Sequence, residues 1–222
     1  MDKINASSLD EISSAMISRY SNRYRELGYD VKTLGWGNEE QQFYRFSQAL
    51  EGLGALSTKS VLDIGCGFGD LLKLLIASRL KPKSYTGWDI NPDLIEEAKT
   101  KWIDYGKSAK FEVHNLAGTE EKNLKVDVAF MFGLLNLNFH DKVDNYTYSY
   151  QLISKAFEYV NEVLVVDFIS DRIASNYPKE DFIFYHNPVK ILEFALSLSP
   201  KVEIKHQYHP IPQREFMLYI YK

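Results

Sequence analysis

The sequence is poor in cysteine. Cys66 is its only cysteine among 222 residues. One cysteine cannot build an intramolecular disulfide framework or a cysteine-rich zinc site. A chain of this length, with 45% hydrophobic side chains, can instead bury a complete core without covalent cross-links.

Long apolar runs are also missing. No uninterrupted stretch approaches the roughly 20 apolar residues that are needed to cross a bilayer. The N-terminal sequence MDKINASSLDEISS is polar and lacks the basic and apolar regions of a secretion signal. We therefore expect a cytoplasmic protein without a membrane partner.

An excess of positive charge is absent as well. The 26 Lys and Arg are outnumbered by 30 Asp and Glu, which gives a net charge of −4. Because binding to duplex nucleic acid normally needs a basic face, no nucleic-acid partner is expected. His206 and His209 flank a predicted strand, but no third ligand has suitable spacing, so no metal site is expected either.

Hydrophobic periodicity divides the chain near residue 54. Two amphipathic helices are predicted at 8–27 and 39–53, and they form an N-terminal helical extension or lid over residues 1–54. Strands and helices alternate in the second domain, 55–222. Strands are expected at 60–65, 84–90, 109–116, 126–136, 163–170, 201–209 and 215–222, and helices at 70–80, 91–106, 144–160 and 187–198.

This alternation predicts an α/β fold with a mostly parallel sheet and helices on both faces. The last two strands are separated only by the sequence PIPQR, which is too short for a helical crossover. These two strands must therefore pair antiparallel.

The segment VLDIGCGFGD at 61–70 is the strongest functional signal. An apolar strand runs into three glycines spaced G-x-G-x-G, and a helix begins directly after them. Such a loop lets the backbone approach a ligand closely at a helix N-terminus. The dinucleotide fingerprint G-x-G-x-x-G would have glycine at position 70, where this chain has Asp. Asp63 would repel a pyrophosphate and favours a ligand with a positive charge.

A second carboxylate completes the pattern. Asp89 ends the next predicted strand, where it can accept hydrogen bonds from both hydroxyls of a ribose. The glycine loop and Asp89, in consecutive strand-helix units, indicate a nucleoside-containing ligand.

With these motifs, residues 55–222 resemble the class I S-adenosylmethionine-dependent methyltransferases. The resemblance implies a Rossmann-like seven-stranded sheet of order 3-2-1-4-5-7-6 with strand 7 antiparallel. S-adenosylmethionine is then the expected cofactor. Asp63 and the loop would wrap its methionine part, and Asp89 would bind its ribose. The residues implied to contact the cofactor are Asp63, Gly65, Cys66, Gly67, Phe68, Gly69, Asp89, Ile90, Leu94, Asn115, Leu116, Phe132, Gly133 and Leu134.

Trp36 and Arg45 in the N-terminal extension are further cofactor candidates. Arg45 can clamp the methionine carboxylate with two parallel hydrogen bonds, or it can form a surface ion pair with Glu39 or Glu51. Cys66 is interpreted as a small side chain that fills the glycine turn.

Catalytic candidates follow the fourth and fifth strands, because ligands of such sheets bind at the carboxyl ends of the strands. His140 is either a general base or part of a helix cap. The aromatic segment 171–187 is long enough to form a lid or a substrate wall. The candidates are Asn136, His140, Ser170, Tyr185 and His186.

The reaction is expected to be methyl transfer to a small molecule, a metabolite or saccharide, by a monomer or homodimer. The sequence contains no D/N-P-P-Y/F motif, which disfavours methylation of base or glutamine amide nitrogens. Three alternatives remain. One is cleavage or cyclisation of S-adenosylmethionine, or transfer of its aminocarboxypropyl group. A non-catalytic nucleoside-binding module is the second, and an NAD-dependent oxidoreductase, disfavoured by Asp70, is the third.

Overall fold

The structure is a computed structural model, and it describes residues 4–173, 177–206 and 215–222. The chain divides into two compact units. One comprises residues 9–122, and the other comprises residues 123–222 together with the residues before Leu9. None of the helices in the described residues is both long and apolar enough to cross a membrane.

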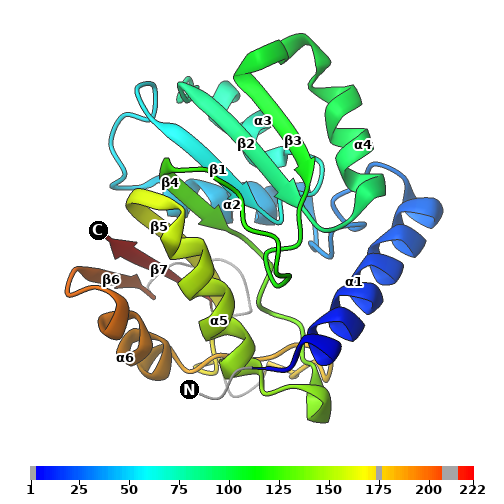
Figure 1. Cartoon of the computed structure of the whole chain (residues 1–222), viewed down its shortest axis with the longest axis vertical. Helices are drawn as coiled ribbons and strands as arrows, with labels where there is room; N and C mark the ends of the chain where they lie inside the picture. The colour runs from blue at the N-terminus through cyan, green and yellow to red at the C-terminus, as the bar shows by residue number, and fades with distance from the viewer. Residues whose placement is uncertain (1–3, 174–176, 207–214) are drawn as a thin grey trace. The chain divides into compact units, whose positions relative to one another are not determined.

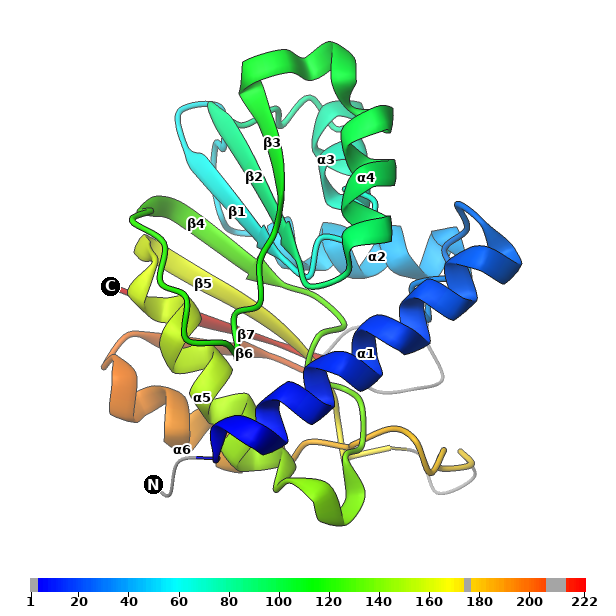
Figure 2. The ribbon, with the colours of Figure 1, turned by 45° about the vertical axis from the view of Figure 1, so that its right-hand side comes forward.

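The first unit contains a three-stranded parallel sheet. β1 pairs with β2 from Ser60↔Ser84 onward, and β2 pairs with β3 from Tyr85↔Ala109 onward. α4 packs along β2 and β3, and Figures 1 and 2 show α3 and α4 on the same side of these strands. The elements are α1 (Ala6–Leu27), α2 (Glu39–Leu50), β1 (Ser60–Ile64), α3 (Asp70–Ala77), β2 (Ser84–Asp89), α4 (Pro92–Lys101), the 3-10 segment η1 (Ile103–Ser108) and β3 (Ala109–Val113).

Local sequence explains where α4 begins and ends. The Asn91 side chain accepts hydrogen bonds from the backbone N–H of Asp93 and Leu94, and Pro92 occupies the first helical position. The sequence predicted one helix over 91–106, but α4 ends at Lys101 with Trp102 as its C-cap, and the 3-10 segment η1 follows. Within η1, Gly106 has φ 52° and ψ −129°, a backbone conformation that an α-helix cannot contain.

The second unit contains β4, β5, β6 and β7. β4 and β5 are parallel, whereas β7 pairs antiparallel with β5 on one side and with β6 on the other. α5 packs on β5, and α6 packs on β6 and β7 (Figure 1). The elements are β4 (Val126–Met131), the 3-10 turn η2 (His140–Lys142), α5 (Asn145–Glu158), β5 (Val160–Ile169), α6 (Pro188–Leu198), β6 (Val202–Lys205) and β7 (Glu215–Tyr221).

The strand order along the sheet is β3-β2-β1-β4-β5-β7-β6. The predicted fold class and the antiparallel β7 are therefore confirmed. β5 and β7 supply much of the core of the second unit, since nearly every residue of both strands is buried. Segment 9–54 groups with β1–β3 in one compact unit, and the proposed domain boundary at residue 54 stays a prediction.

Candidate functional site

The glycine loop connects β1 to α3 as a tight turn. Gly65, Gly67 and Gly69 have φ values of 77°, 51° and 76°, a region that side chains strongly disfavour. The backbone N–H groups of Gly65 and Cys66 both donate to the carbonyl of Trp88, at 2.7 and 3.0 Å. The end of β2 therefore fixes the start of the loop.

Close packing is a second reason for glycine in this loop. A Cβ atom at Gly67 would lie 2.8 Å from Leu34 Cδ1, and one at Gly69 would lie 2.6 Å from Trp102 Nε1. A larger residue at either position would force these neighbouring side chains to move, because they already occupy the space.

Asp89 is joined directly to the glycine loop. Its Oδ2 accepts from the Gly67 N–H at 2.9 Å, and its Oδ1 accepts from the Asn91 N–H at 2.8 Å. Burial raises the pKa of Asp89, while backbone donors at Asn91, Gly67 and Ile90 oppose this shift. A carboxylate has about four lone-pair sites, so Asp89 can accept a further hydrogen bond from a ligand.

Asp63 and Cys66 are buried beneath the loop. The Tyr85 hydroxyl donates to Asp63 Oδ2. Burial raises the pKa of Asp63 to about 7. Burial also raises the pKa of the Cys66 thiol well above its ordinary value, so it is a poor nucleophile. A Cβ atom at Gly87 would lie 2.8 Å from Cys66 Sγ, which agrees with a space-filling role for this cysteine.

The predicted adenine contacts cluster around the ends of β2 and β3. Leu94 and Leu116 are buried, and Ile90 is half-buried. The Asn115 side chain already has partners at both ends: Nδ2 donates to Ser13 Oγ, and Oδ1 accepts from the Ala117 N–H, both at 3.0 Å. Its hydrogen bond to Ser13 connects this edge of the sheet to α1.

Trp36 and Arg45 are brought together in the N-terminal segment. The Arg45 guanidinium lies 4.3 Å from the centroid of the Trp36 ring, a distance typical of cation–π contact. Arg45 is 6% exposed, so it is not a surface residue. Glu39, one of its possible surface partners, forms an ion pair with Lys73.

In the second unit, Phe132, Gly133 and Leu134 follow β4. The Gly133 N–H donates to Asp167 Oδ1 at 2.6 Å, which fixes the turn after the strand. Phe132 is buried and stacks on Phe130 with 5.4 Å between ring centroids, while Leu134 is half-buried.

Asn136, Ser170 and His186 meet at the carboxyl ends of β4 and β5. Asn136 Oδ1 accepts from the Ile169 N–H at 2.9 Å, and Ser170 forms a parallel β-bridge with His186. All three residues are buried. His186 Nε2 lies 3.1 Å from Ser149 Oγ, and burial lowers the pKa of His186 to about 3. His186 is therefore a neutral residue of the protein interior near neutral pH.

His140 and Tyr185 are more accessible. The His140 side chain is 53% exposed, and its Nε2 lies 3.8 Å from Asp181 Oδ2. The Tyr185 hydroxyl accepts from the Glu180 N–H at 2.9 Å. The alternative role of His140 as a helix cap is wrong, because Asp144 caps α5 by accepting from the Thr147 N–H at 2.7 Å.

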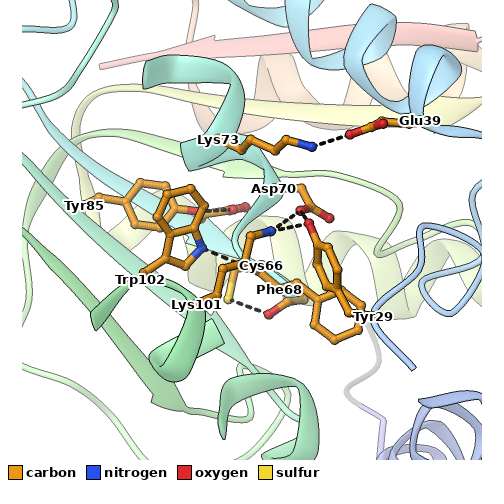
Figure 3. A network of polar contacts seen from close by, with 11 residues as sticks. Tyr29, Glu39, Cys66, Phe68, Asp70, Lys73, Tyr85, Lys101 and Trp102 are labelled. Atoms are coloured by element: carbon orange, nitrogen blue, oxygen red, sulfur yellow. Dashed lines mark hydrogen bonds and ion pairs between the residues drawn. The ribbon is translucent and has the colours of Figure 1, made fainter. Parts of the chain in front are cut away.

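Two polar clusters were not predicted from the sequence. His206 Nε2 lies 2.7 Å from Ser170 Oγ. β6 and β5 run in the same direction, since each is antiparallel to β7, and this shared direction could have indicated the contact. Tyr29, Asp70 and Lys101 form the second cluster, near the glycine loop (Figure 3). His209 lies outside the described residues. The described residues contain no group of three His, Cys, Asp or Glu placed to hold a metal ion.

Residues 61–156 match a family model described as a methyltransferase domain. The matched residues make up less than half of the chain, and they include the glycine loop and Asp89. The match agrees with the resemblance of the sequence to S-adenosylmethionine-dependent methyltransferases. No curated protein is similar enough in sequence to match the chain.

Solved methyltransferase structures share this fold. The magnesium protoporphyrin IX methyltransferase from Synechocystis PCC 6803 has a TM-score of 0.67 at 18% identity, over 99% of this chain and 100% of that one. The CcbJ methyltransferase from Streptomyces caelestis has a TM-score of 0.55 at 13% identity, over 80% of this chain and 88% of that one. The small RNA methyltransferase HEN1 has a TM-score of 0.60 at 16% identity, over 81% of this chain and 24% of that one.

The polar groups beside the glycine loop fit S-adenosylmethionine. Asp89 presents a buried carboxylate that the Gly67 N–H holds against the loop. A carboxylate is an acceptor that suits the hydroxyls of a ribose.

Proposed function

We propose that this chain transfers a methyl group from S-adenosylmethionine to a small-molecule acceptor, a metabolite or saccharide. The observation that supports the cofactor half of this proposal is the hydrogen bond between the Gly67 N–H and Asp89 Oδ2, which holds a ribose-binding carboxylate against the glycine loop. The net charge of −4 supports a small acceptor over a nucleic acid, since a phosphate backbone would be repelled.

Each half of the cofactor has its own proposed contacts. S-adenosylmethionine supplies an electrophilic methyl group on its sulfonium. The glycine loop and Arg45 hold the methionine part, and Asp89 binds the ribose. Ile90, Leu94, Asn115 and Leu116 surround the adenine. Asn115 would contribute mainly through its backbone, because its side chain already binds Ser13 and Ala117.

The residues proposed to act on the methyl acceptor have two roles, which differ with the exposure of their side chains. His140 is the candidate base, because its side chain is accessible to an acceptor. Tyr185 would contribute to the wall of the acceptor site. Asn136, Ser170 and His186 are buried, and we assign them to positioning the turns that follow β4 and β5.

Product analysis tests the reaction. The protein is incubated with methyl-labelled S-adenosylmethionine and a cell extract, with or without prior ribonuclease treatment, and labelled products are identified by mass spectrometry. We expect S-adenosylhomocysteine and a labelled small molecule in both samples. Label lost after ribonuclease treatment would indicate an RNA acceptor. Methylthioadenosine formed without any acceptor, and faster than in buffer alone, would show that the chain cleaves its cofactor instead.

Replacing the ribose carboxylate tests the site. Asp89→Ala removes a charged acceptor, and hydrogen bonds to charged groups are worth roughly 1.5–3 kcal/mol, so affinity for S-adenosylhomocysteine should fall by about 10- to 150-fold. Asp93→Ala is the matched control, because Asp93 is exposed on the next helix. Calorimetry that gives equal affinities for a folded Asp89→Ala variant and the wild type would exclude Asp89 from the site.

A further inference from the structure

Three polar side chains from separate segments meet beside the glycine loop, and we name them the latch: Tyr29, Asp70 and Lys101 (Figure 3). Tyr29 follows α1, Asp70 is the first residue of α3, and Lys101 is the last residue of α4. The latch therefore joins the N-terminal segment to both helices that follow the cofactor-binding strands.

One carboxylate oxygen is the centre of the latch. Asp70 Oδ1 accepts from the Tyr29 hydroxyl and from Lys101 Nζ, each at 2.8 Å, and Lys101 also donates to the Tyr29 hydroxyl oxygen. Lys101 Nζ lies 4.0 Å from the centroid of the Tyr29 ring, so cation–π attraction adds to the ion pair.

Burial distinguishes this ion pair from those on the surface. The Asp70 side chain is 4% exposed and the Lys101 side chain 21%, whereas those of Lys73 and Glu39 are 43% and 54% exposed. A buried carboxylate that loses its cation is left as an uncompensated charge, while an exposed pair is screened by water. Loss of Lys101 should therefore displace Asp70 and its neighbours.

Residues that pack around the latch also hold the glycine loop in place. Phe68 is fully buried, and its ring lies 5.7 Å from that of Tyr24 and 4.9 Å from that of Tyr29 between centroids. The Phe68 carbonyl accepts from Trp102 Nε1 at 2.9 Å (Figure 3). The segment from Phe68 to Asp70 is thus fixed by side chains of the N-terminal segment and of α4.

We infer that Tyr29, Asp70 and Lys101 are positioning residues for the methionine end of the cofactor. By holding Phe68, Gly69 and Asp70, they fix the part of the loop that would enclose the aminocarboxypropyl group. The ribose contact should depend on them less, because Asp89 is held by its place in β2 and by the Asn91 N–H, and its one bond to the loop is to Gly67, which precedes the segment that the latch holds. This inference rests on the proposed function, and it gives the N-terminal segment a role in shaping the loop in addition to covering the ligand.

Two ligands that differ only at the methionine end test the inference. S-adenosylhomocysteine has the aminocarboxypropyl group, and 5′-methylthioadenosine lacks it. Dissociation constants for both are measured by calorimetry on the wild type, Tyr29→Phe and Lys101→Met. Lys73→Met is the matched control, since it removes an exposed ion pair from α3. Circular dichroism and thermal unfolding establish that each variant is folded.

We expect Lys101→Met to lower the affinity for S-adenosylhomocysteine by about tenfold or more, which corresponds to the loss of one charge-assisted interaction. Tyr29→Phe should lower this affinity less, and methylthioadenosine should bind both variants with an affinity within about twofold of that of the wild type. Lys73→Met should change the affinity for neither ligand. If Lys101→Met does not fold, Tyr29→Phe still tests the inference, because it removes a single hydroxyl.

Two results would overturn the inference. An equal loss of affinity for both ligands would mean that the latch only stabilises the unit. Unchanged affinities in both folded variants would mean that the loop does not need the latch to bind the methionine end. A wild-type protein that binds neither ligand would instead contradict the proposed function itself.

Discussion

Asp63 should make the stability of the protein fall as the pH rises toward neutrality. It lies on β1, it is buried, and it accepts a hydrogen bond from Tyr85. Burial is the largest cause that raises its pKa from 3.8 to about 7. The Tyr85 hydroxyl lowers the pKa, and the charges of Asp89 and Asp70 raise it.

The direction of this pH dependence follows from the number of protons bound by the folded and unfolded chains. Between pH 3.8 and about 7, the folded protein keeps a proton on Asp63 that the unfolded chain has lost. The stabilisation is complete below the unfolded pKa and is lost as the pH rises through the folded one. One extra bound proton changes the free energy of unfolding by up to about 1.4 kcal/mol per pH unit.

Urea unfolding of the wild type and Asp63→Asn between about pH 5 and pH 8 measures this effect. Asparagine keeps the size of the side chain but cannot titrate. The wild type should lose stability relative to the variant up to about pH 7 and then show a constant difference. Tyr85→Phe removes the donor to Asp63 and should move the end of this window to higher pH. A difference between wild type and Asp63→Asn that does not change with pH would refute the reasoning.

Two further substitutions each test an interaction within one of the two units. Gly69→Ala places a Cβ atom 2.6 Å from Trp102 Nε1 at φ 76°, whereas Gly54→Ala has a similar φ of 69° and open space. Thermal unfolding should show that Gly69→Ala loses clearly more than the roughly 1 kcal/mol expected from backbone strain alone in Gly54→Ala, and equal losses would argue against the clash. His186→Phe removes a buried histidine whose pKa is lowered from 6.5 to about 3, so only the unfolded chain takes up its proton between these values. Wild-type stability should therefore fall, relative to His186→Phe, as the pH drops from about 6.5 toward 3, and parallel acid profiles would contradict this.

Local sequence patterns were sufficient to predict most of the fold. The antiparallel β7 followed from the length of the preceding link, a constraint that needs no tertiary information. The ends of elements were less predictable. The predicted helix over 91–106 continues after Lys101 only as the 3-10 segment η1, and the predicted helix over 144–160 ends at Glu158, since β5 begins at Val160.

The site was predictable where spacing along the chain determines it. The glycine loop and Asp89 follow adjacent strands, and the structure joins them by a hydrogen bond. The latch has no local signature, because its hydrogen bonds link residues that are 31, 41 and 72 positions apart. The burial of His186 likewise depends on Ser149 from α5 and Phe168 from β5, which its own neighbourhood in the sequence does not reveal.

The placement of β7 between β5 and β6 has a consequence for synthesis. Within the described residues, β6 pairs only with β7, and β5 pairs with β4 on one side and with β7 on the other. On the ribosome, β5 and β6 emerge before the strand that joins them, so both present open hydrogen-bonding edges for that interval. Such edges are where nascent chains associate with one another. Slow translation or weak chaperone supply in this interval should therefore lower the yield of soluble protein, even when the finished fold is stable.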